Sequence, residues 1–259
     1  MSLLSMNLLT KRFGGLCAVN EVKFDIEPGE IVAIIGPNGS GKTTLLNLVS
    51  GLLPITSGTL LWKGANIGDT SSHERSSLGI VKTFQNPLLF GELTVQDHLR
   101  IASHLRFKRE LGWRRLAEIV GASRRIRQVH EGIGVHLEEV LRMCRLADKR
   151  GTQAESLSYG DEKMLGVAMA LMCEPELLLL DEPASGLGQD EVENLDGVLR
   201  DLQRSGVTLC IIDHKVGFLG KLADRALAMA NGSALAAGRT QDVLRNPLVV
   251  EAYLGAGHA

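Results

Sequence analysis

Residues 36–43 of this 259-residue chain read GPNGSGKT, and this segment limits the possible folds more than any other feature. It matches the pattern G-x-x-x-x-G-K-[ST], in which glycines let successive backbone N–H groups face one anion. The apolar run 31–35 before it predicts a buried strand, and the pattern from Lys42 to about Val49 predicts the following helix. We therefore expect an α/β fold with a phosphate-binding loop, rather than a glycine-rich turn without a ligand.

A second apolar run, residues 177–180, ends in Asp181-Glu182. This places both acids at the carboxyl edge of the sheet, where open α/β folds bind their ligands. In phosphate-loop proteins the lysine contacts the β- and γ-phosphates, the hydroxyl of Thr43 would ligate Mg²⁺, and Asp181 would hold Mg²⁺ through water. Glu182 can accept a proton from an attacking water. The pair alone would be a solvated turn, but with the loop it indicates ATP and Mg²⁺, and no N-K-x-D motif supports a GTPase.

The rest of the chain alternates between strand-like and helical patterns. Strand signals fill residues 1–35 and resume after the first helix to about residue 84, whereas helical periodicity dominates from 86 to about 154. Helices and strands then alternate to residue 238, and a terminal helix follows. We predict one domain with a parallel α/β core and a helical insertion. Its parts are the core (1–85 and 156–240), the inserted subdomain (86–155) and a C-terminal helical tail (241–259).

Composition narrows the classes of function. Lysine and arginine total 28 against 30 acids, and this balance gives no support for a nucleic-acid partner. Four cysteines without a CxxC pair indicate reduced, buried thiols rather than disulfides or zinc. No apolar run approaches the roughly 18–20 residues that cross a bilayer, so any membrane role is expected to be peripheral. Nine basic residues between Arg100 and Arg127 form either a solvated face or an anionic lipid or partner contact.

Five motifs follow one another in an informative order. They are GPNGSGKT, TFQNP with Gln85, LSYGD at 157–161, LLLLDEP, and IIDHK with His214. This order resembles the ATP-binding cassettes of ABC transporters, whose signature motif is usually LSGGQ. The resemblance spans essentially the whole chain. It implies a phosphate-loop NTPase cassette with an N-terminal antiparallel β subdomain and an inserted α-helical subdomain.

The resemblance implies a role for each matching residue. Phe13, in KRFGG, would stack on adenine unless it is a core residue of an early strand. Gln85 would contact Mg²⁺ and water unless it is a turn residue. His214 would contact the γ-phosphate as a switch histidine unless it is an ordinary core or surface histidine. The residues expected to hold the nucleotide in the loop are Gly36, Pro37, Asn38, Gly39, Ser40, Gly41, Lys42, Thr43 and Thr44.

The signature residues Ser158, Tyr159, Gly160 and Asp161 precede a predicted helix. A serine and open N–H groups at a helix start make an anion site. In the family this site serves the γ-phosphate bound by the other subunit, so two nucleotides are buried in a head-to-tail dimer. One loop and one signature per chain imply that a working unit needs two chains, as a homodimer or a heterodimer.

Three positions depart from the family pattern. Asp161-Glu162-Lys163 replaces a glutamine-rich continuation of the signature. Gly188, in SGLGQ, stands where aspartate or asparagine is common, which removes a side-chain contact between subunits. Asp213 precedes the switch histidine where glutamate is common. These differences fall at residues that the resemblance assigns to the subunit interface and to the switch, and they leave the loop residues 36–44 unchanged.

Longer segments resemble the ATP-binding subunits of branched-chain amino acid importers and their urea or amide relatives. They are LTKRFGGLCAVN, TFQNPLLFGELTVQDHL, DEPASGLG and NPLVVEAYLG. The resemblance implies ATP hydrolysis coupled to import at the cytoplasmic face of the inner membrane. The implied partners are integral membrane permease subunits, a second ATP-binding subunit and, indirectly, an extracytoplasmic solute-binding protein. A lipid exporter, or an ABC ATPase outside transport, stays an alternative.

The apolar segment Leu88-Leu89-Phe90 follows Gln85 closely. It could form a groove for a permease helix. Packing in the core of the helical insertion is an equal alternative.

Overall fold

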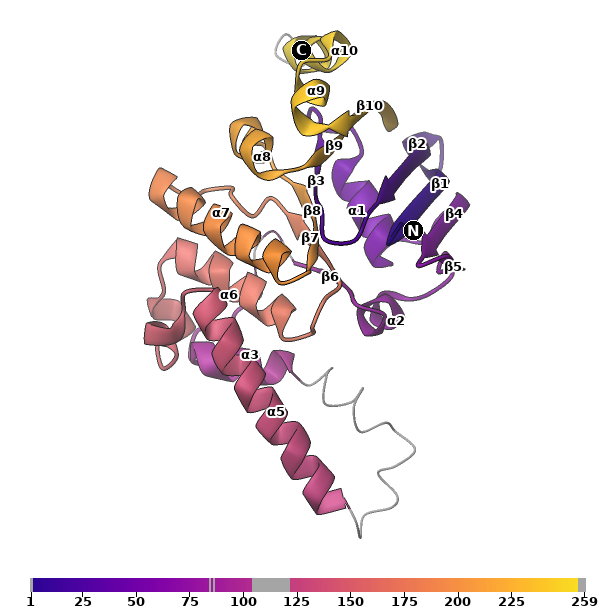
Figure 1. The fold of residues 1–259 in the computed structure, drawn as a ribbon. Helices are drawn as coiled ribbons and strands as arrows, with labels where there is room; N and C mark the ends of the chain where they lie inside the picture. The colour runs from indigo at the N-terminus through magenta and orange to yellow at the C-terminus, as the bar shows by residue number, and fades with distance from the viewer. Residues whose placement is uncertain (1, 84, 86, 104–121, 256–259) are drawn as a thin grey trace. The chain divides into compact units, whose positions relative to one another are not determined.

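The computed structural model describes residues 2–83, 85, 87–103 and 122–255. The chain divides into two compact units, each of which is described by itself below (Figure 1). Unit 1 contains residues 1–85 and 176–259, and unit 2 contains residues 86–175. Most of the arginine-rich segment predicted to be a solvated face or a contact surface lies outside the described residues.

Unit 1 is built on two sheets. The smaller sheet is antiparallel, with the order β2-β1-β4-β5, and its strands are β1 (Leu4–Phe13), β2 (Leu16–Ile26), β4 (Ser57–Trp62) and β5 (Ala65–Asn66). The larger sheet has the order β10-β9-β3-β8-β7-β6. Its strands are β3 (Ile31–Ile35), β6 (Ile80–Lys82), β7 (Leu177–Asp181), β8 (Thr208–Ile212), β9 (Arg225–Ala230) and β10 (Ser233–Arg239). All pairs in it are parallel except β9 with β10.

Helices cover both faces of the larger sheet. The strands β3, β7 and β8 are buried at every residue, as expected of apolar strands with helices on both sides. Helix α1 (Lys42–Ser50) packs between the two sheets, and its apolar residues join one core with residues of both. Helices α7 (Gln189–Arg204) and α8 (Val216–Leu222) lie on the opposite face of the larger sheet (Figure 1). Because β3, β7 and β8 run parallel, their carboxyl ends lie along one edge of the sheet.

Unit 1 ends in two helices, α9 (Thr240–Leu244) and α10 (Pro247–Gly255), which contact β10. It also contains α2 (Ser72–Ser77), in a region where strand-like segments were predicted. The strand prediction for this region holds for β4, β5 and β6 but missed α2, because SHERSS has no apolar periodicity. The signal for α2 lies in its capping box, in which Ser71 accepts from the N–H of Glu74 and the Glu74 carboxylate accepts from the N–H of Ser71.

One buried arginine joins α2 to the end of α1. Arg75 is 1% exposed, and its guanidinium donates to the carbonyls of Leu48 and Val49 and to those of Ile67 and Gly68. Its Nε also donates to the Thr70 hydroxyl at 3.0 Å. Leu48 and Val49 belong to the last turn of α1, where carbonyls lack the usual helical partners, and the Leu48 carbonyl otherwise accepts only a long bond of 3.3 Å from the N–H of Gly51. Arg75 thus caps the helix that begins at the phosphate loop.

Unit 2 is helical in its described part. It contains α3 (Val95–Ala102), α5 (Ala122–Met143), two short 3₁₀ helices (Ala147–Lys149 and Ala154–Ser156) and α6 (Tyr159–Leu171). Helix α6 packs against α3 and α5, and residues 156–175 consequently belong to unit 2. The predicted return of the chain to the core at residue 156 is therefore corrected to residue 176.

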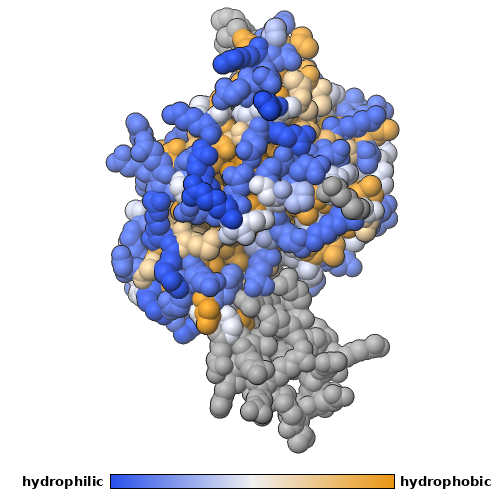
Figure 2. Space-filling view, in the orientation of Figure 1, coloured by the Kyte–Doolittle hydropathy of each residue, from blue (hydrophilic) through white to orange (hydrophobic). Residues whose placement is uncertain are grey.

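The α/β fold with an antiparallel subdomain and a helical insertion is confirmed. On the face shown in Figure 2, hydrophilic residues predominate and apolar residues form small scattered groups. None of the described helices combines the length and hydropathy needed to cross a membrane. Among the cysteines, Cys144 and Cys210 are buried as predicted, whereas Cys17 and Cys173 are partly exposed.

Candidate functional site

The phosphate loop lies between β3 and α1, as the sequence predicted. Gly36, Gly39 and Gly41 have φ values of +147°, +76° and +99°. A Cβ at Gly36 would lie 2.1 Å from the Met229 carbonyl oxygen, and one at Gly41 would lie 2.3 Å from that of Ala18. Glycine is therefore required at both ends of the loop.

The first turn of α1 is open to an anion. Within the described chain, no side chain caps this helix at Gly41, so its N–H groups keep their hydrogen-bonding capacity and the positive end of the helix dipole. Asn38, Gly39 and Thr43 are exposed, and Thr44 is partly exposed. The donor set of this loop fits a polyphosphate.

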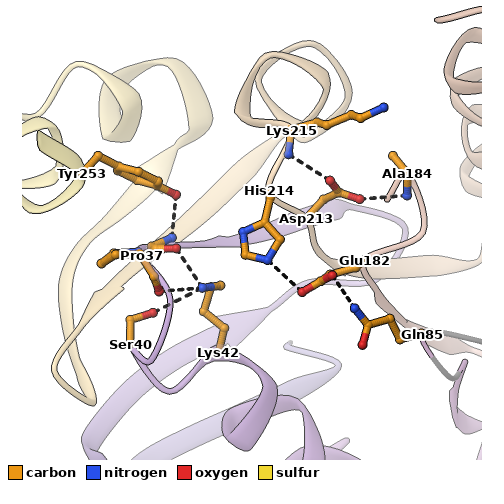
Figure 3. A network of polar contacts seen from close by, with 11 residues as sticks. Pro37, Ser40, Lys42, Gln85, Glu182, Ala184, Asp213, His214, Lys215 and Tyr253 are labelled. Atoms are coloured by element: carbon orange, nitrogen blue, oxygen red, sulfur yellow. Dashed lines mark hydrogen bonds and ion pairs between the residues drawn. The ribbon is translucent and has the colours of Figure 1, made fainter. Parts of the chain in front are cut away.

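Lys42 lies inside the loop with its ammonium group buried. Its Nζ donates to the carbonyls of Gly36 and Pro37, each at 2.8 Å, and lies 3.5 Å from the Ser40 hydroxyl (Figure 3). Burial lowers the pKa of this ammonium, and the nearby carboxylates of Glu182 and Asp181 act in the opposite direction. Lys42 is thus pre-positioned at the loop, where a phosphate would stabilise its charge.

Glu182 connects the two other predicted catalytic residues (Figure 3). Its Oε1 lies 2.8 Å from Nε2 of His214, and its Oε2 accepts from Nε2 of Gln85 at 2.5 Å. Gln85 lies 97 positions and His214 lies 32 positions from Glu182 in the sequence, yet the structure brings all three together. Glu182 has a φ of +53°, a strained conformation for a non-glycine residue that is typical of functional sites.

Asp213 holds the segments that carry Glu182 and His214. Its Oδ2 accepts from the N–H of Ala184 at 2.8 Å, and its Oδ1 accepts from the N–H of Lys215 at 2.9 Å (Figure 3). The side chain is buried, with the residue 2% exposed. From sequence Asp213 was only a departure from the family pattern, whereas the structure gives it a positioning role between the loops after β7 and β8.

The predicted metal residue Asp181 is buried beside a lysine. Its Oδ2 lies 3.0 Å from Nζ of Lys82, which also donates to the Asn47 side chain at 2.7 Å. The Lys82 ammonium competes with a metal ion for this carboxylate oxygen, which fits the prediction that Asp181 would hold Mg²⁺ through water rather than directly. No cluster of three or more His, Cys, Asp or Glu residues that could hold a metal ion occurs among the described residues. Mg²⁺ at Asp181, Thr43 and Gln85 would therefore need phosphate or water oxygens as additional ligands.

The signature residues lie in unit 2, at the start of α6. Ser158 is the N-cap, and its hydroxyl accepts from the N–H of Asp161 at 3.2 Å and donates to the Asp161 carboxylate at 2.6 Å. The same carboxylate oxygen lies 2.5 Å from Nζ of Lys149. Burial raises the pKa of Asp161, but the contacts with Lys149 and Ser158 outweigh it and hold the pKa below its usual value. Tyr159 and Gly160 form the first turn.

Phe13 and Gly188 are both exposed in unit 1. Phe13 is 46% exposed at the end of β1, with the Lys11 ammonium 5.0 Å from its ring centroid, so it is not a core residue. Its ring is accessible for stacking. Gly188 lies at the start of α7, where its N–H donates to the Glu191 carboxylate at 2.9 Å.

Four polar residues near these sites had no role assigned from sequence. They are Lys82, Lys149, Asp213 and Tyr253. Most of their contacts join residues that are distant in the sequence, which a local pattern does not encode. The sequence offers a signal for Lys82 alone, because a lysine that ends the apolar strand Ile80–Lys82 needs a partner.

Comparison with known proteins identifies the family. A family model described as ABC transporter matches residues 19–185. The protein of Escherichia coli (strain K12) named high-affinity branched-chain amino acid transport ATP-binding protein LivG is 36% identical, and the match covers 98% of each chain. The probable branched-chain amino acid transport ATP-binding protein LivG of Archaeoglobus fulgidus is 37% identical, over 99% of this chain and 96% of that protein.

Solved structures agree with this match. A nucleotide-free ATP-binding cassette from an ABC transporter aligns with a TM-score of 0.83 and 29% identity, over 98% of this chain and 99% of that one. The ADP conformation of the ATP-binding cassette MJ1267 aligns with the same values. The chain therefore belongs to the ABC transporter family, as one of its ATP-binding cassettes.

Proposed function

We propose that this chain is the ATP-binding and ATP-hydrolysing subunit of an importer for branched-chain or related amino acids. The contact of Glu182 with both Gln85 and His214, beside the buried Lys42, is the observation that carries the hydrolytic part. The names of relatives that match essentially the whole chain support the importer and the class of solute.

In this proposal the loop residues 36–44 bind the phosphates of ATP, and Lys42 contacts the β- and γ-phosphates. Bound Mg²⁺ would supply charge neutralisation at these phosphates, and the residues that fit it are Thr43, Gln85 and Asp181. Glu182 accepts a proton from the attacking water as general base. Gln85 and His214 hold the Glu182 carboxylate in place, and His214 also contacts the γ-phosphate.

The signature residues act on a second nucleotide. Ser158 and the first turn of α6 would bind the γ-phosphate held by the loop of a partner subunit, which makes the active unit a head-to-tail dimer. The partner is either a second copy of this chain or a related subunit. Phe13 would stack on the adenine of the nucleotide bound to its own chain.

The remaining partners follow from import across a membrane. In this proposal the chain lies at the cytoplasmic face of the inner membrane, bound to integral permease subunits and served indirectly by an extracytoplasmic solute-binding protein. Leu88 is 83% exposed and Phe90 is 63% exposed, so neither packs in the core of unit 2. Their exposure supports the alternative in which this segment contacts a permease.

Recovery of the tagged chain from native membranes, with its bound proteins identified by mass spectrometry, tests this assignment. We expect two hydrophobic permeases, a second ATPase and an amino-acid-type binding protein. Recovery of ribosomal, nucleic-acid or lipid-export proteins instead would contradict the importer and leave the ATPase site standing.

The departure at Asp161 leads to a testable prediction. An aspartate at the signature would place a negative charge near the partner's γ-phosphate, and Lys149 neutralises it through the 2.5 Å contact. Replacing Lys149 with methionine is expected to lower ATP turnover about two- to fivefold, the scale of a partly exposed ion pair. Steady-state ATPase rates of the variant measure this loss.

The double variant provides the control. In the Asp161→Gln background no carboxylate needs neutralising, so the Lys149→Met change should have almost no effect on turnover. An equal loss of turnover in both backgrounds would show that Lys149 acts independently of Asp161.

A further inference from the structure

The C-terminal helix contacts the phosphate loop directly. The N–H of Gly36, the first residue of the loop, donates to the hydroxyl of Tyr253 at 2.7 Å (Figure 3). Tyr253 lies on α10, 217 positions further along the chain. We propose that Tyr253 is a positioning residue for nucleotide binding, through which the C-terminal helix and the phosphate loop are coupled. This coupling rests on the proposed nucleotide site.

Gly36 depends on this contact because of where its backbone lies. The residue is buried and has a φ of +147°, and the carbonyl oxygen of Met229 occupies the space that a side chain would need. A buried backbone N–H must find an acceptor or lose free energy. The hydroxyl of Tyr253 provides that acceptor, which fixes the point where the chain leaves β3 and enters the loop.

Lys42 extends this chain of hydrogen bonds into the loop. The carbonyl of Gly36 accepts from Nζ of Lys42 at 2.8 Å, so one residue is held by Tyr253 at its N–H and by the lysine at its carbonyl. When phosphates bind near Lys42, the polarisation of this short chain of hydrogen bonds changes at both ends. The Tyr253 hydroxyl should therefore respond to the nucleotide without touching it.

The helix is anchored so that Tyr253 keeps its place. Val249, four residues earlier and on the same face of α10, is 2% exposed, and the Asn246 side chain accepts from the N–H of Leu248 at 3.0 Å at the helix start. Burial raises the pKa of the Tyr253 hydroxyl, against the opposing effect of the Gly36 N–H. The hydroxyl is neutral near pH 7, as a phenol normally is, and one of its lone pairs accepts from the N–H of Gly36.

The chain contains two tyrosines, Tyr159 and Tyr253, which makes a direct test feasible. Full-length protein with ¹³Cζ-labelled tyrosine gives two signals, and the Tyr253→Phe variant assigns them. During titration with MgADP, the Tyr253 signal is expected to shift with the dissociation constant that calorimetry measures. A stationary Tyr253 signal while calorimetry records binding would overturn the coupling and leave the nucleotide site intact. Absence of MgADP binding would overturn the nucleotide site and this coupling with it.

Affinity provides the second measurement. Tyr253→Phe keeps the ring and removes the acceptor, and we expect the dissociation constant of MgADP to rise about three- to tenfold, as for the loss of one hydrogen bond. The control is Leu248→Ala, which changes a 56% exposed residue of the same helix and should leave the affinity unchanged. If Tyr253→Phe lowers the melting temperature but not the affinity, the residue only fastens the C-terminal helix and the proposal is wrong.

Discussion

Glu182→Gln is expected to reduce ATP turnover about 10²–10⁴-fold, the usual contribution of a general base, while ATP still binds. Glutamine has nearly the same shape as glutamate and cannot accept the proton. Its oxygen can still accept from Gln85, and its amide can donate to a neutral His214, so the three side chains keep their arrangement. Lys42 and the loop are unchanged, which is why binding should persist. Single-turnover hydrolysis and nucleotide binding, measured separately, distinguish the two effects.

A matched acid outside the site controls for the loss of a negative charge. Glu193, on α7, is exposed, and Glu193→Gln should leave both binding and turnover unchanged. Full turnover in the Glu182→Gln variant would remove Glu182 from the mechanism. A parallel loss of ATP binding would instead mean that the carboxylate mainly supports the loop.

The parts of the site that local sequence predicted are those that one segment encodes. Short patterns, in which spacing determines geometry, predicted the loop at 36–43, its flanking strand and helix, and the acids Asp181 and Glu182 at the end of β7. Glu182 and His214 lie close together because the parallel strands β7 and β8 place their carboxyl ends on one edge.

The contacts that the sequence did not predict depend on packing between segments that are distant in the chain. Lys82 meets Asp181 because β6 pairs with β7 in a register that no local pattern encodes. Tyr253 contacts Gly36 because α10, which follows all the strands of the core in the sequence, lies against the start of the loop. The error at residue 156 has the same origin, since α6 has the composition of a core helix but packs on α3 and α5.

Arg75→Met is expected to lower the free energy of unfolding by about 3–5 kcal/mol. Methionine keeps much of the side-chain volume but donates no hydrogen bond, so four carbonyls lose a donor. Those of Leu48 and Ile67 keep a second donor, from Gly51 and Thr70 respectively, so most of the loss, about 1–3 kcal/mol per carbonyl, falls on the other two. Two of the four, those of Leu48 and Val49, end α1 and also lose the favourable positive charge. For a chain of this size the melting temperature should fall by roughly 10 °C.

Two further variants test whether the loss of stability comes from the buried hydrogen bonds of Arg75. Arg204 is an arginine with 72% of its side chain exposed and a surface contact to Asp201, and Arg204→Met should cost less than about 1 kcal/mol. Arg75→Lys keeps the charge but replaces a planar group with five donors by a single ammonium, so its stability should fall between those of the wild type and Arg75→Met. Equal melting temperatures for the Arg75→Met and Arg204→Met variants would show that water replaces the guanidinium without cost. A loss confined to the Arg75 variants would mean that the buried contacts of this guanidinium, at the carbonyl end of α1, contribute to the stability of the fold far more than a surface ion pair does.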